Sequence, residues 1–254
     1  MKYDVRQLPL LSNTEIAQGI FDMRLAYAQE DLPVACGQFA HVYVPGKTLR
    51  RPISVCDASG GELRLVYQVK GEGTKIMSQM QSGTVDVLAP LGNGFHIEPG
   101  KRYALIGGGI GVPPMLYTAK QCDDPLIITG FRNASLVILQ EDLAAQGETL
   151  LCTDDGTAGV KGFVSDLLRA HIAEVDEVCA CGPTPMLQAV AAVCKEHGKP
   201  CQVSLEERMG CGVGACLVCA VKVRKNGEEI MQHVCKNGPV FNAEEVVFRW
   251  LICL

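Results

Sequence analysis

The chain has 254 residues, of which 48% are hydrophobic, and a formal net charge of -5 at pH 7. This length suits one large domain or two modest ones with a small appendage, and the apolar fraction allows sizeable cores. A negative net charge disfavours nucleic-acid binding, because neutralising phosphates requires clustered lysine and arginine. No apolar stretch reaches membrane-spanning length, and the first residues are charged where a signal peptide is apolar, so we expect a cytoplasmic protein without membrane insertion.

Residues 1–98 are typical of an all-β domain. The segments GQFAHVYV (37–44) and GELRLVYQVKG (61–71) alternate apolar and polar residues, and glycine and proline punctuate them. Short strands at this spacing predict an antiparallel barrel or sandwich.

Residues 99–203 have a different pattern, in which strands and helices alternate. An apolar strand over residues 103–106 enters a glycine turn, after which Pro113 and Pro114 open a helix. Further alternating segments end in the strand-like PCQVSLEE (200–207). This order predicts a parallel sheet flanked by helices. Residues 204–254 then form a small C-terminal segment, so we predict a multi-domain chain with three parts.

The C-terminal segment contains a cluster of cysteines. The chain has 13 cysteines, an odd number that argues against a disulfide framework in a cytoplasmic protein. Cys211, Cys216 and Cys219 follow the spacing C-x4-C-x2-C, and Cys235 follows after 15 intervening residues. This is the spacing of plant-type [2Fe–2S] ferredoxins. We therefore predict that these four thiolates bind a [2Fe–2S] cluster.

The residues around the four cysteines support this prediction. Asn226 and Gly227 stand between two alternating runs, which predicts a hairpin that returns Cys235 to the other three thiols. Gly210, Gly212 and Gly214 allow the backbone to curl closely around an inorganic core. The alternative is a structural zinc site, because four cysteines also satisfy tetrahedral zinc. Zinc ribbons usually have two C-x2-C knuckles, and only Cys216 and Cys219 form one here.

A flavin-like motif lies in the β-rich part. In RRPISVCD (50–57), Arg51 is suited to clamping a pyrophosphate and Ser54 to hydrogen-bonding a flavin ring edge. GEGT (71–74) offers amides and a hydroxyl to a phosphate. Taken alone, each motif is better explained by an ordinary strand or turn. Their position upstream of a glycine-rich nucleotide turn and a cysteine cluster favours flavin binding.

Two further motifs predict a nicotinamide nucleotide site. LIGGGIGVPPM (105–115) joins a strand to a helix through Gly108, Gly109 and Gly111, but it is not the G-x-G-x-x-G fingerprint. CACGPTPM (179–186) also joins a strand to a helix, where ligands of open α/β sheets collect. Cys181 and Gly182 would lie at this edge, with Cys181 either beside the nicotinamide or buried as a structural residue. No acidic or basic residue distinguishes NAD from NADP.

The five histidines show no catalytic pattern. They have neither metal-ligand spacing nor a nucleophile partner, and we interpret them as scattered structural or surface residues. They are His41, His96, His171, His197 and His233.

Taken in order, six segments resemble one known family, the electron-transfer subunit of dihydroorotate dehydrogenase B, within the ferredoxin–NADP reductase superfamily. The segments are RRPIS, GEGT, PLGNGF, GGGIGVPPM, CGPTPML and EERMGCGVGAC. The resemblance implies an FAD-binding barrel over 1–98, an NAD-binding α/β domain over 99–203 and a [2Fe–2S] segment over 204–254. The FAD contacts that it implies are Arg51, Pro52, Ile53, Ser54, Val66, Tyr67, Gln68, Gly73 and Thr74.

The resemblance also implies a function and a partner. An FMN-containing catalytic subunit would oxidise dihydroorotate to orotate in pyrimidine biosynthesis, in an expected heterotetramer with two copies of each subunit. Because a [2Fe–2S] centre passes single electrons and a nicotinamide accepts a hydride, FAD would connect the two. We expect no dihydroorotate oxidation by this chain alone. The tail FRWLICL (248–254) is longer than the family leads us to expect.

Two alternatives remain at this point. One is a subunit of an electron-bifurcating or hydrogenase-associated NAD(P)H–ferredoxin reductase, which would share the barrel, the nucleotide fold and a related cluster segment. The other is a non-catalytic scaffold with a zinc-stapled tail. The RPIS segment and the complete set of four cysteines favour the pyrimidine enzyme.

Overall fold

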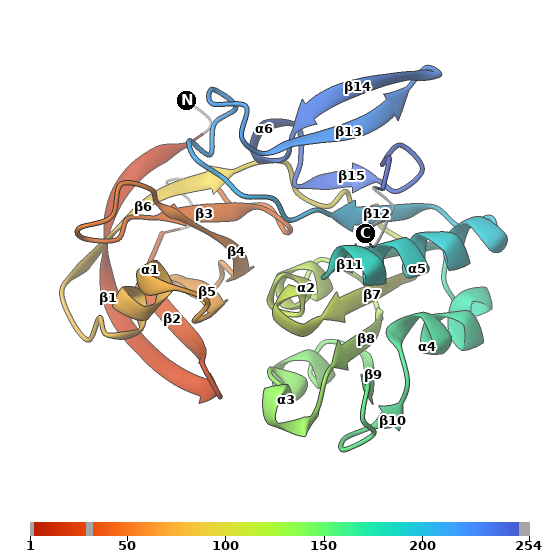
Figure 1. The fold of residues 1–254 in the computed structure, drawn as a ribbon. Helices are drawn as coiled ribbons and strands as arrows, with labels where there is room; N and C mark the ends of the chain where they lie inside the picture. Colours follow the sequence, from red (N-terminus) through yellow and green to blue (C-terminus); the bar gives the residue numbers. More distant parts are fainter. Residues whose placement is uncertain (1–2, 29–32, 249–254) are drawn as a thin grey trace.

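In a computed structural model, which describes residues 3–28 and 33–248, the chain forms a closed β-barrel, a seven-stranded sheet and a two-stranded hairpin (Figure 1). All but the first residue of the tail FRWLICL lies outside the described residues. No helix in the described part of the chain is long and apolar enough to cross a membrane.

The barrel confirms the antiparallel prediction. Its strands are β1 (Asp4–Ala17), β2 (Ile20–Ala26), β3 (Phe39–Val42), β4 (Arg51–Asp57), β5 (Glu62–Gln68) and β6 (Thr84–Leu91). They pair in the order β1-β2-β5-β4-β3-β6, and β6 closes the barrel on β1. The first half of β1 pairs with β6 and the second half with β2, with a register shift between Leu10 and Ser12. Such irregularities bend a strand at a barrel corner.

The predicted parallel sheet is also confirmed, and it has two additional short strands, one at each edge. Its order is β10-β9-β8-β7-β11-β12-β15, and only the last pairing is antiparallel. The strands are β7 (Tyr103–Gly108), β8 (Leu126–Phe131), β9 (Glu148–Thr153), β10 (Val160–Lys161), β11 (Glu177–Cys181), β12 (Cys201–Ser204) and β15 (Val240–Asn242). The edge strand β15 comes from the C-terminal segment, so that segment is tied to the nucleotide sheet.

Helices cover both faces of this sheet. The principal ones are α2 (Pro113–Ala119), α3 (Gln140–Ala144), α4 (Val164–His171) and α5 (Thr184–Glu196). Along β7, Ala104 and Ile106 pack with α4 and α5. Tyr103 and Leu105, on the opposite face, pack with α2 and α3 and with the barrel. The sheet is therefore buried on both faces, which explains its continuous apolar strands.

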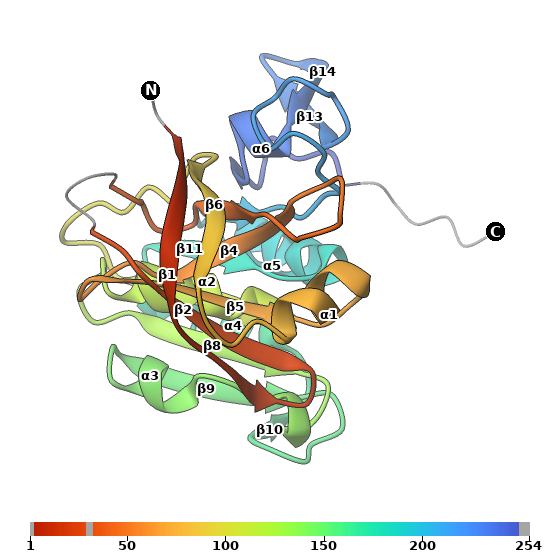
Figure 2. The same ribbon diagram turned by 90° about the vertical axis from the view of Figure 1, so that its left-hand side faces the viewer.

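The flavin barrel and the nucleotide sheet share one hydrophobic core. Val55 and Leu65 of the barrel belong to the same buried cluster as Val112 and Met115 of α2. Burial of this shared apolar surface holds the two parts in a fixed relation. Helix α1 (Glu72–Ser78) lies beside the barrel (Figure 2).

The C-terminal segment contains the predicted hairpin. Strands β13 (Ala220–Lys225) and β14 (Glu228–His233) are joined by Asn226 and Gly227, both at positive φ. Two adjacent residues at positive φ form the turn that matches the twist of paired strands. The short helix α6 (Val234–Asn237) follows, and Figure 2 shows it with the hairpin at one end of the molecule.

Candidate functional site: four thiols beside two nucleotide-binding surfaces

The four predicted cluster ligands lie on two neighbouring pieces of chain. Cys211 and Cys216 are in the loop between β12 and β13, Cys219 directly precedes β13, and Cys235 is in α6. The backbone amides of Cys211 and Cys216 each donate to the other residue's sulfur at 3.4 Å, and the amide of Cys235 donates to the sulfur of Cys219 at 3.4 Å. The first pair is the more exposed and the second is buried. The hairpin thus brings Cys235 back to the other three, as predicted.

Backbone amides of the same loop are directed at the sulfurs. The sulfur of Cys211 accepts hydrogen bonds from the amides of Val213, Ala215 and Cys216 at 3.2–3.4 Å. The amide of Gly214 donates to the sulfur of Cys235 at 3.1 Å, which links the two pairs. Amides around sulfur ligands stabilise negative charge and tune the reduction potential of a cluster.

The two pairs differ in how easily their thiols lose a proton. Partial burial raises the pKa of Cys211, but the amides of Val213, Cys216 and Ala215 outweigh it and lower the pKa to about 6. Burial, and then the neighbouring Cys219, raise the pKa of Cys235 to about 12. Cys211 therefore loses its proton more readily than Cys235, and the thiolate is the form of cysteine that binds a metal ion.

Glycine is required at two positions of the loop. Gly212 and Gly214 have φ values of +74° and +82°, which side chains with a Cβ rarely adopt. A Cβ at Gly214 would also lie 2.5 Å from Cδ of Lys236, and one at Gly212 would lie 2.7 Å from Nδ1 of His41. The loop therefore curls tightly and lies close to both α6 and the barrel.

The two metal alternatives differ in how they use the four thiolates. A zinc site places four ligands around one ion. A [2Fe–2S] centre takes four thiolates shared between two irons. The spacing C-x4-C-x2-C with a fourth cysteine 15 residues later is the feature that favours the two-iron interpretation.

The flavin-like motif brings an arginine onto the start of a helix. The guanidinium of Arg51 lies so close to Gly73 that a Cβ there would be 2.2 Å from its Nε. Arg51 also donates to the backbone oxygen of Leu49. The hydroxyl of Thr74 accepts hydrogen bonds from the amides of Lys70 and Gly71, so it is already engaged in closing the turn. A cation and a glycine turn thus meet at one place, which suits a pyrophosphate.

The other predicted flavin contacts surround this place, but two of them point elsewhere. Pro52, Ile53 and Ser54 are half-buried on β4 and Gln68 is half-buried at the end of β5. The side chains of Val66 and Tyr67 are buried. The hydroxyl of Tyr67 donates to Oδ1 of Asn13 at 3.0 Å. The side chains of these two residues therefore pack inside the barrel.

The two glycine motifs of the nucleotide sheet meet at its carboxyl edge. Cys181 pairs with Gly107 at the ends of the adjacent parallel strands β11 and β7. A Cβ at Gly111 would be 2.3 Å from the backbone oxygen of Cys181, and one at Gly108 would be 2.3 Å from the sulfur of Met186. Gly109 has φ +54° and nothing near it, and a Cβ at Gly182 would be 3.2 Å from the Gly108 amide. The glycines at 108, 111 and 182 thus let the two motifs pack closely against each other, and Gly109 alone has open space beside it. This edge is where ligands of open α/β sheets collect.

The thiol of Cys181 is buried at this edge. Its burial raises its pKa to about 12, although the hydroxyl of Ser204 lowers it in part. Cys181 therefore carries a protonated thiol at neutral pH, which is the state of an unreactive cysteine.

The cluster-binding segment is anchored on the barrel. The amide of Asn93 donates to the backbone oxygen of Gly238 at 2.6 Å, and its side chain donates to that of Asn237 at 3.0 Å. Phe39 and Leu91 of the barrel pack against Cys219 and Cys235 in one buried cluster. The four thiols therefore lie next to the domain that carries the flavin-like motif.

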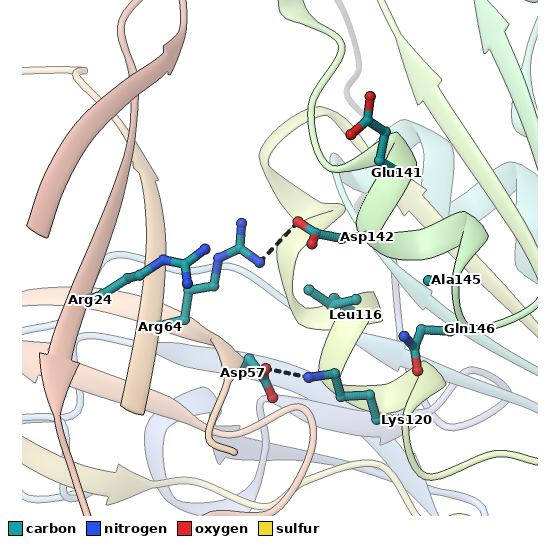
Figure 3. A pocket seen from close by; sticks show the side chains of 9 residues that line it. All are labelled: Arg24, Asp57, Arg64, Leu116, Lys120, Glu141, Asp142, Ala145 and Gln146. Carbon is teal, nitrogen blue, oxygen red and sulfur yellow. Dashed lines mark hydrogen bonds and ion pairs between the residues drawn. The ribbon is translucent and has the colours of Figure 1, made fainter. Parts of the chain in front are cut away.

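A separate polar cavity of about 370 Å³ lies between the barrel and the nucleotide domain (Figure 3). Arg64, held by Asp22, reaches across it to Asp142 at 2.9 Å, and Lys120 pairs with Asp57. The cavity is lined by Arg24, Asp57, Arg64, Leu116, Lys120, Glu141, Asp142, Ala145 and Gln146. These charges link the two domains, and none of the predicted cofactor residues lines the cavity.

Sequence reasoning missed His41 at this site. The interpretation of His41 as a structural residue agrees with its complete burial, but its contact with Gly212 of the cluster-binding loop was not predicted. Residue 41 and residue 212 are joined only by the fold, so no local spacing signals the pair. Asn93 belongs to the segment PLGNGF, which did contribute to the family resemblance.

Comparison with known proteins agrees with this geometry. Residues 206–247 match the family described as the iron–sulfur cluster binding domain of dihydroorotate dehydrogenase B. The dihydroorotate dehydrogenase B (NAD(+)) electron transfer subunit of Caldanaerobacter subterraneus is 42% identical over 244 residues, covering 94% of this chain and 97% of that protein. The protein of the same name from Bacillus caldolyticus is 46% identical over 224 residues, covering 83% and 86%.

Two solved structures are similar as well. An NADH-dependent reduced ferredoxin–NADP oxidoreductase, studied for flavin-based electron bifurcation, is 30% identical with a TM-score of 0.85, covering 96% of this chain and 90% of that one. A ferredoxin NADP+ reductase from Neisseria gonorrhoeae with bound FAD and NADP has a TM-score of 0.64, covering 78% and 92%. Its identity of 18% supports the fold alone.

Proposed function

The chain belongs to the family of dihydroorotate dehydrogenase B electron-transfer subunits, and we propose that it conducts electrons from a [2Fe–2S] centre by way of FAD to NAD⁺. The observation that carries this proposal is that backbone amides of the loop before β13 are directed at the sulfurs of Cys211 and Cys235, so the loop and α6 bring the cysteines together. The [2Fe–2S] centre supplies one-electron exchange, NAD⁺ takes up a hydride, and FAD exchanges electrons with both.

For the iron–sulfur centre, the chain supplies ligands and a polar setting. Cys211 and Cys216 would hold one iron, and Cys219 and Cys235 the other. The loop amides offset the negative charge of four thiolates, and this charge grows on reduction.

For FAD, the chain supplies Arg51 and the turn at Gly73 as the pyrophosphate site. The guanidinium gives a fixed, bidentate donor that matches phosphate oxygens. Ser54 and Gln68 then offer polar groups to the ring system, and Pro52, Ile53, Val66 and Tyr67 offer backbone and apolar contact. Thr74 shapes the turn.

For NAD⁺, the chain supplies the carboxyl edge of the sheet. Gly108, Gly109 and Gly111 form one side of this site and Cys181 with Gly182 forms the other. Because these positions lack side chains or bury them, the backbone can approach the pyrophosphate and nicotinamide closely. The protonated thiol of Cys181 places no charge beside the transferring hydride.

The partner that we propose is an FMN-containing catalytic subunit that oxidises dihydroorotate to orotate, in a heterotetramer of two copies of each chain. The surface around the exposed thiol pair supports this choice. Leu217 and Val218 are 64% and 56% exposed directly after Cys216. Apolar side chains beside an exposed redox ligand suit a protein interface where electrons enter.

We further propose the division of the chain into 1–98, 99–203 and 204–254, and a cytoplasmic location. The thirteen cysteines support the location, because the twelve in the described residues are free. Dihydroorotate oxidation is assigned to the partner, so this chain alone has no such activity.

A second candidate is a subunit of an electron-bifurcating ferredoxin reductase, which is favoured by the TM-score of 0.85 to such a structure. The 42% identity to the Caldanaerobacter protein favours the first candidate over the 30% identity to the second. The deciding experiment mixes the purified chain with the catalytic subunit and measures NADH formed from dihydroorotate. Turnover only in the mixture supports the proposal, and reduction of ferredoxin without any dihydroorotate-dependent turnover contradicts it.

A further inference from the structure

The side chain of His41 lies between the flavin barrel and the cluster-binding loop. Its neighbours Ala40 and Val42 point into the barrel core, so the imidazole points outward, toward the C-terminal segment. Phe39, on the same face, packs with Cys219 and Cys235. The ring of Phe39 meets the imidazole edge-on, with 5.8 Å between centroids. The side chain of His41 is 0% exposed.

No polar partner satisfies this buried ring. Neither ring nitrogen of His41 has a hydrogen-bond partner within the described residues. The nearby Arg50 forms an ion pair with Asp86 at 2.7 Å and donates to the backbone oxygen of His41 at 3.3 Å, while leaving the ring unpaired. Buried polar atoms in folded proteins almost always have a partner, and an exception points to a bound group. A neutral imidazole has one N–H donor, and no acceptor in the part of the chain that the structure describes lies within hydrogen-bonding distance of the His41 N–H.

The ring faces a residue next to a cluster ligand. A Cβ at Gly212 would lie 2.7 Å from Nδ1 and 2.8 Å from Cε1 of His41. Only a glycine lets the loop come so close to the imidazole. Gly212 directly follows Cys211, whose sulfur is the one that collects three amide hydrogen bonds. The unpartnered donor of His41 therefore lies beside the residue that directly follows the predicted ligand Cys211.

We infer that a ring N–H of His41 donates a hydrogen bond to a sulfur of the bound iron–sulfur centre, which makes His41 a positioning residue for that centre. The inference rests on the [2Fe–2S] centre proposed above. Thiolate and sulfide sulfurs are acceptors, and they would satisfy the one polar group on this face that lacks a partner. A donor at this place stabilises the more negative, reduced centre and raises its reduction potential.

Two further observations agree with this role. Burial, with the charge of Arg50 second, lowers the pKa of His41 to about 4, so the ring is neutral at pH 7. His41 also lies opposite Pro52 in the pairing of the adjacent strands β3 and β4. Pro52 stands between Arg51 and Ile53 of the flavin-like motif. The imidazole of His41 thus contacts the cluster-binding loop, and its backbone is part of the sheet that carries the predicted flavin contacts. His41 therefore fixes the position of the loop relative to that sheet.

The test uses the full chain, purified anaerobically with histidine labelled with ¹⁵N in the ring. Iron and inorganic sulfide are first quantified. Pulsed electron paramagnetic resonance of the reduced protein then measures nitrogen couplings to the cluster, and a redox titration measures its potential. Four variants accompany the parent. His41→Leu removes the donor, and His41→Asn keeps an N–H near the position of Nδ1. Leu91→Val changes apolar packing at the same glycine, and His233→Leu removes a different histidine.

The expected result is a ring-nitrogen coupling in the parent protein that is absent from His41→Leu and present in His233→Leu, which removes the histidine nearest in sequence to Cys235. His41→Leu lowers the reduction potential, His41→Asn restores most of it, and Leu91→Val leaves it unchanged. No ring-nitrogen coupling in the iron-loaded parent overturns the inference, even if a variant fails to fold. Equal shifts in His41→Leu and Leu91→Val also overturn it. Absence of iron from the parent overturns the proposed centre itself.

Discussion

The guanidinium of Arg51 lies directly over the backbone of Gly73, at the start of α1. A Cβ on Gly73 would be 2.2 Å from Nε and 2.4 Å from Nη2 of this arginine. The two residues are separated in sequence by a whole strand and a turn. A larger residue at position 73 would force the Arg51 guanidinium to move. This contact defines the place where we expect the pyrophosphate of FAD.

Substituting Gly73→Ala is expected to weaken FAD binding. The added methyl displaces the Arg51 guanidinium and removes one charge-assisted contact, which amounts to a roughly tenfold weaker affinity, or about 1.4 kcal/mol. The matched control is Gly71→Ala, because Gly71 has extended φ and a Cβ added there would meet nothing within 4 Å. Fluorescence titration of FAD measures both. Equal losses in the two variants would show that Arg51 does not bind the pyrophosphate.

Substituting Gly214→Ala is expected to reduce loading of the cluster by more than half. The methyl group would meet Lys236 at 2.5 Å and push away an amide that donates to Cys235. Gly227→Ala is the control, because Gly227 has a similar φ of +84° with open space around it. Both variants carry backbone strain of about 1–2 kcal/mol. Only Gly214→Ala should lose iron and sulfide after reconstitution, and matching losses would contradict the role of the loop amides.

The burial of Tyr67 should make the folded protein less stable at alkaline pH. Burial raises its pKa from 10 to about 12, although Asn13 lowers it in part. Because the folded pKa exceeds the unfolded one, the associated stability is complete below pH 10 and is lost as the pH rises from 10 to about 12. The loss approaches ~3 kcal/mol.

Denaturant unfolding at pH 8 and pH 11.5 tests this prediction on the parent and on Tyr67→Phe. At pH 8 the variant lacks the hydrogen bond to Asn13 and is about 1 kcal/mol less stable. Near pH 11.5 that deficit should disappear or reverse, because phenylalanine has no proton to lose. A constant difference at both pH values would contradict the predicted pKa.

Arg64 is expected to matter for stability far more than its interdomain partner. Its side chain bonds Asp22, which is 7% exposed, and reaches Asp142, which is 44% exposed (Figure 3). Arg64→Met leaves the buried Asp22 with the longer ion pair to Arg24 at 3.4 Å, at a cost of about 3 kcal/mol. Asp142→Asn removes an exposed pair, worth about 0–1 kcal/mol. Chemical unfolding of both variants distinguishes them, and similar losses would mean that the interdomain pair dominates.

Much of the fold follows from local patterns in the sequence. The cysteine spacing predicted that Cys211, Cys216, Cys219 and Cys235 act together, and the fold brings them near one another. Asn226 and Gly227 predicted their hairpin because both must adopt positive φ. These signals are short-range and depend on residue type.

Contacts between distant segments could not be predicted in this way. The strand β15 has only three residues and shows no alternation, so its place beside β12 depends on the folded sheet. The contacts of His41 with Gly212 and of Arg51 with Gly73 likewise join residues with no common local pattern. The family resemblance implied which residues contact the flavin. It did not indicate that the side chains of Val66 and Tyr67 would be buried.

The most direct measurement is the iron, acid-labile sulfide and zinc content of the full chain after anaerobic purification. If two thiol pairs hold a redox centre, about two irons and two sulfides accompany each chain, with a visible spectrum that bleaches on reduction. A colourless protein with one zinc and neither iron nor sulfide would remove the carrier of single electrons, and the proposed electron transfer would be wrong.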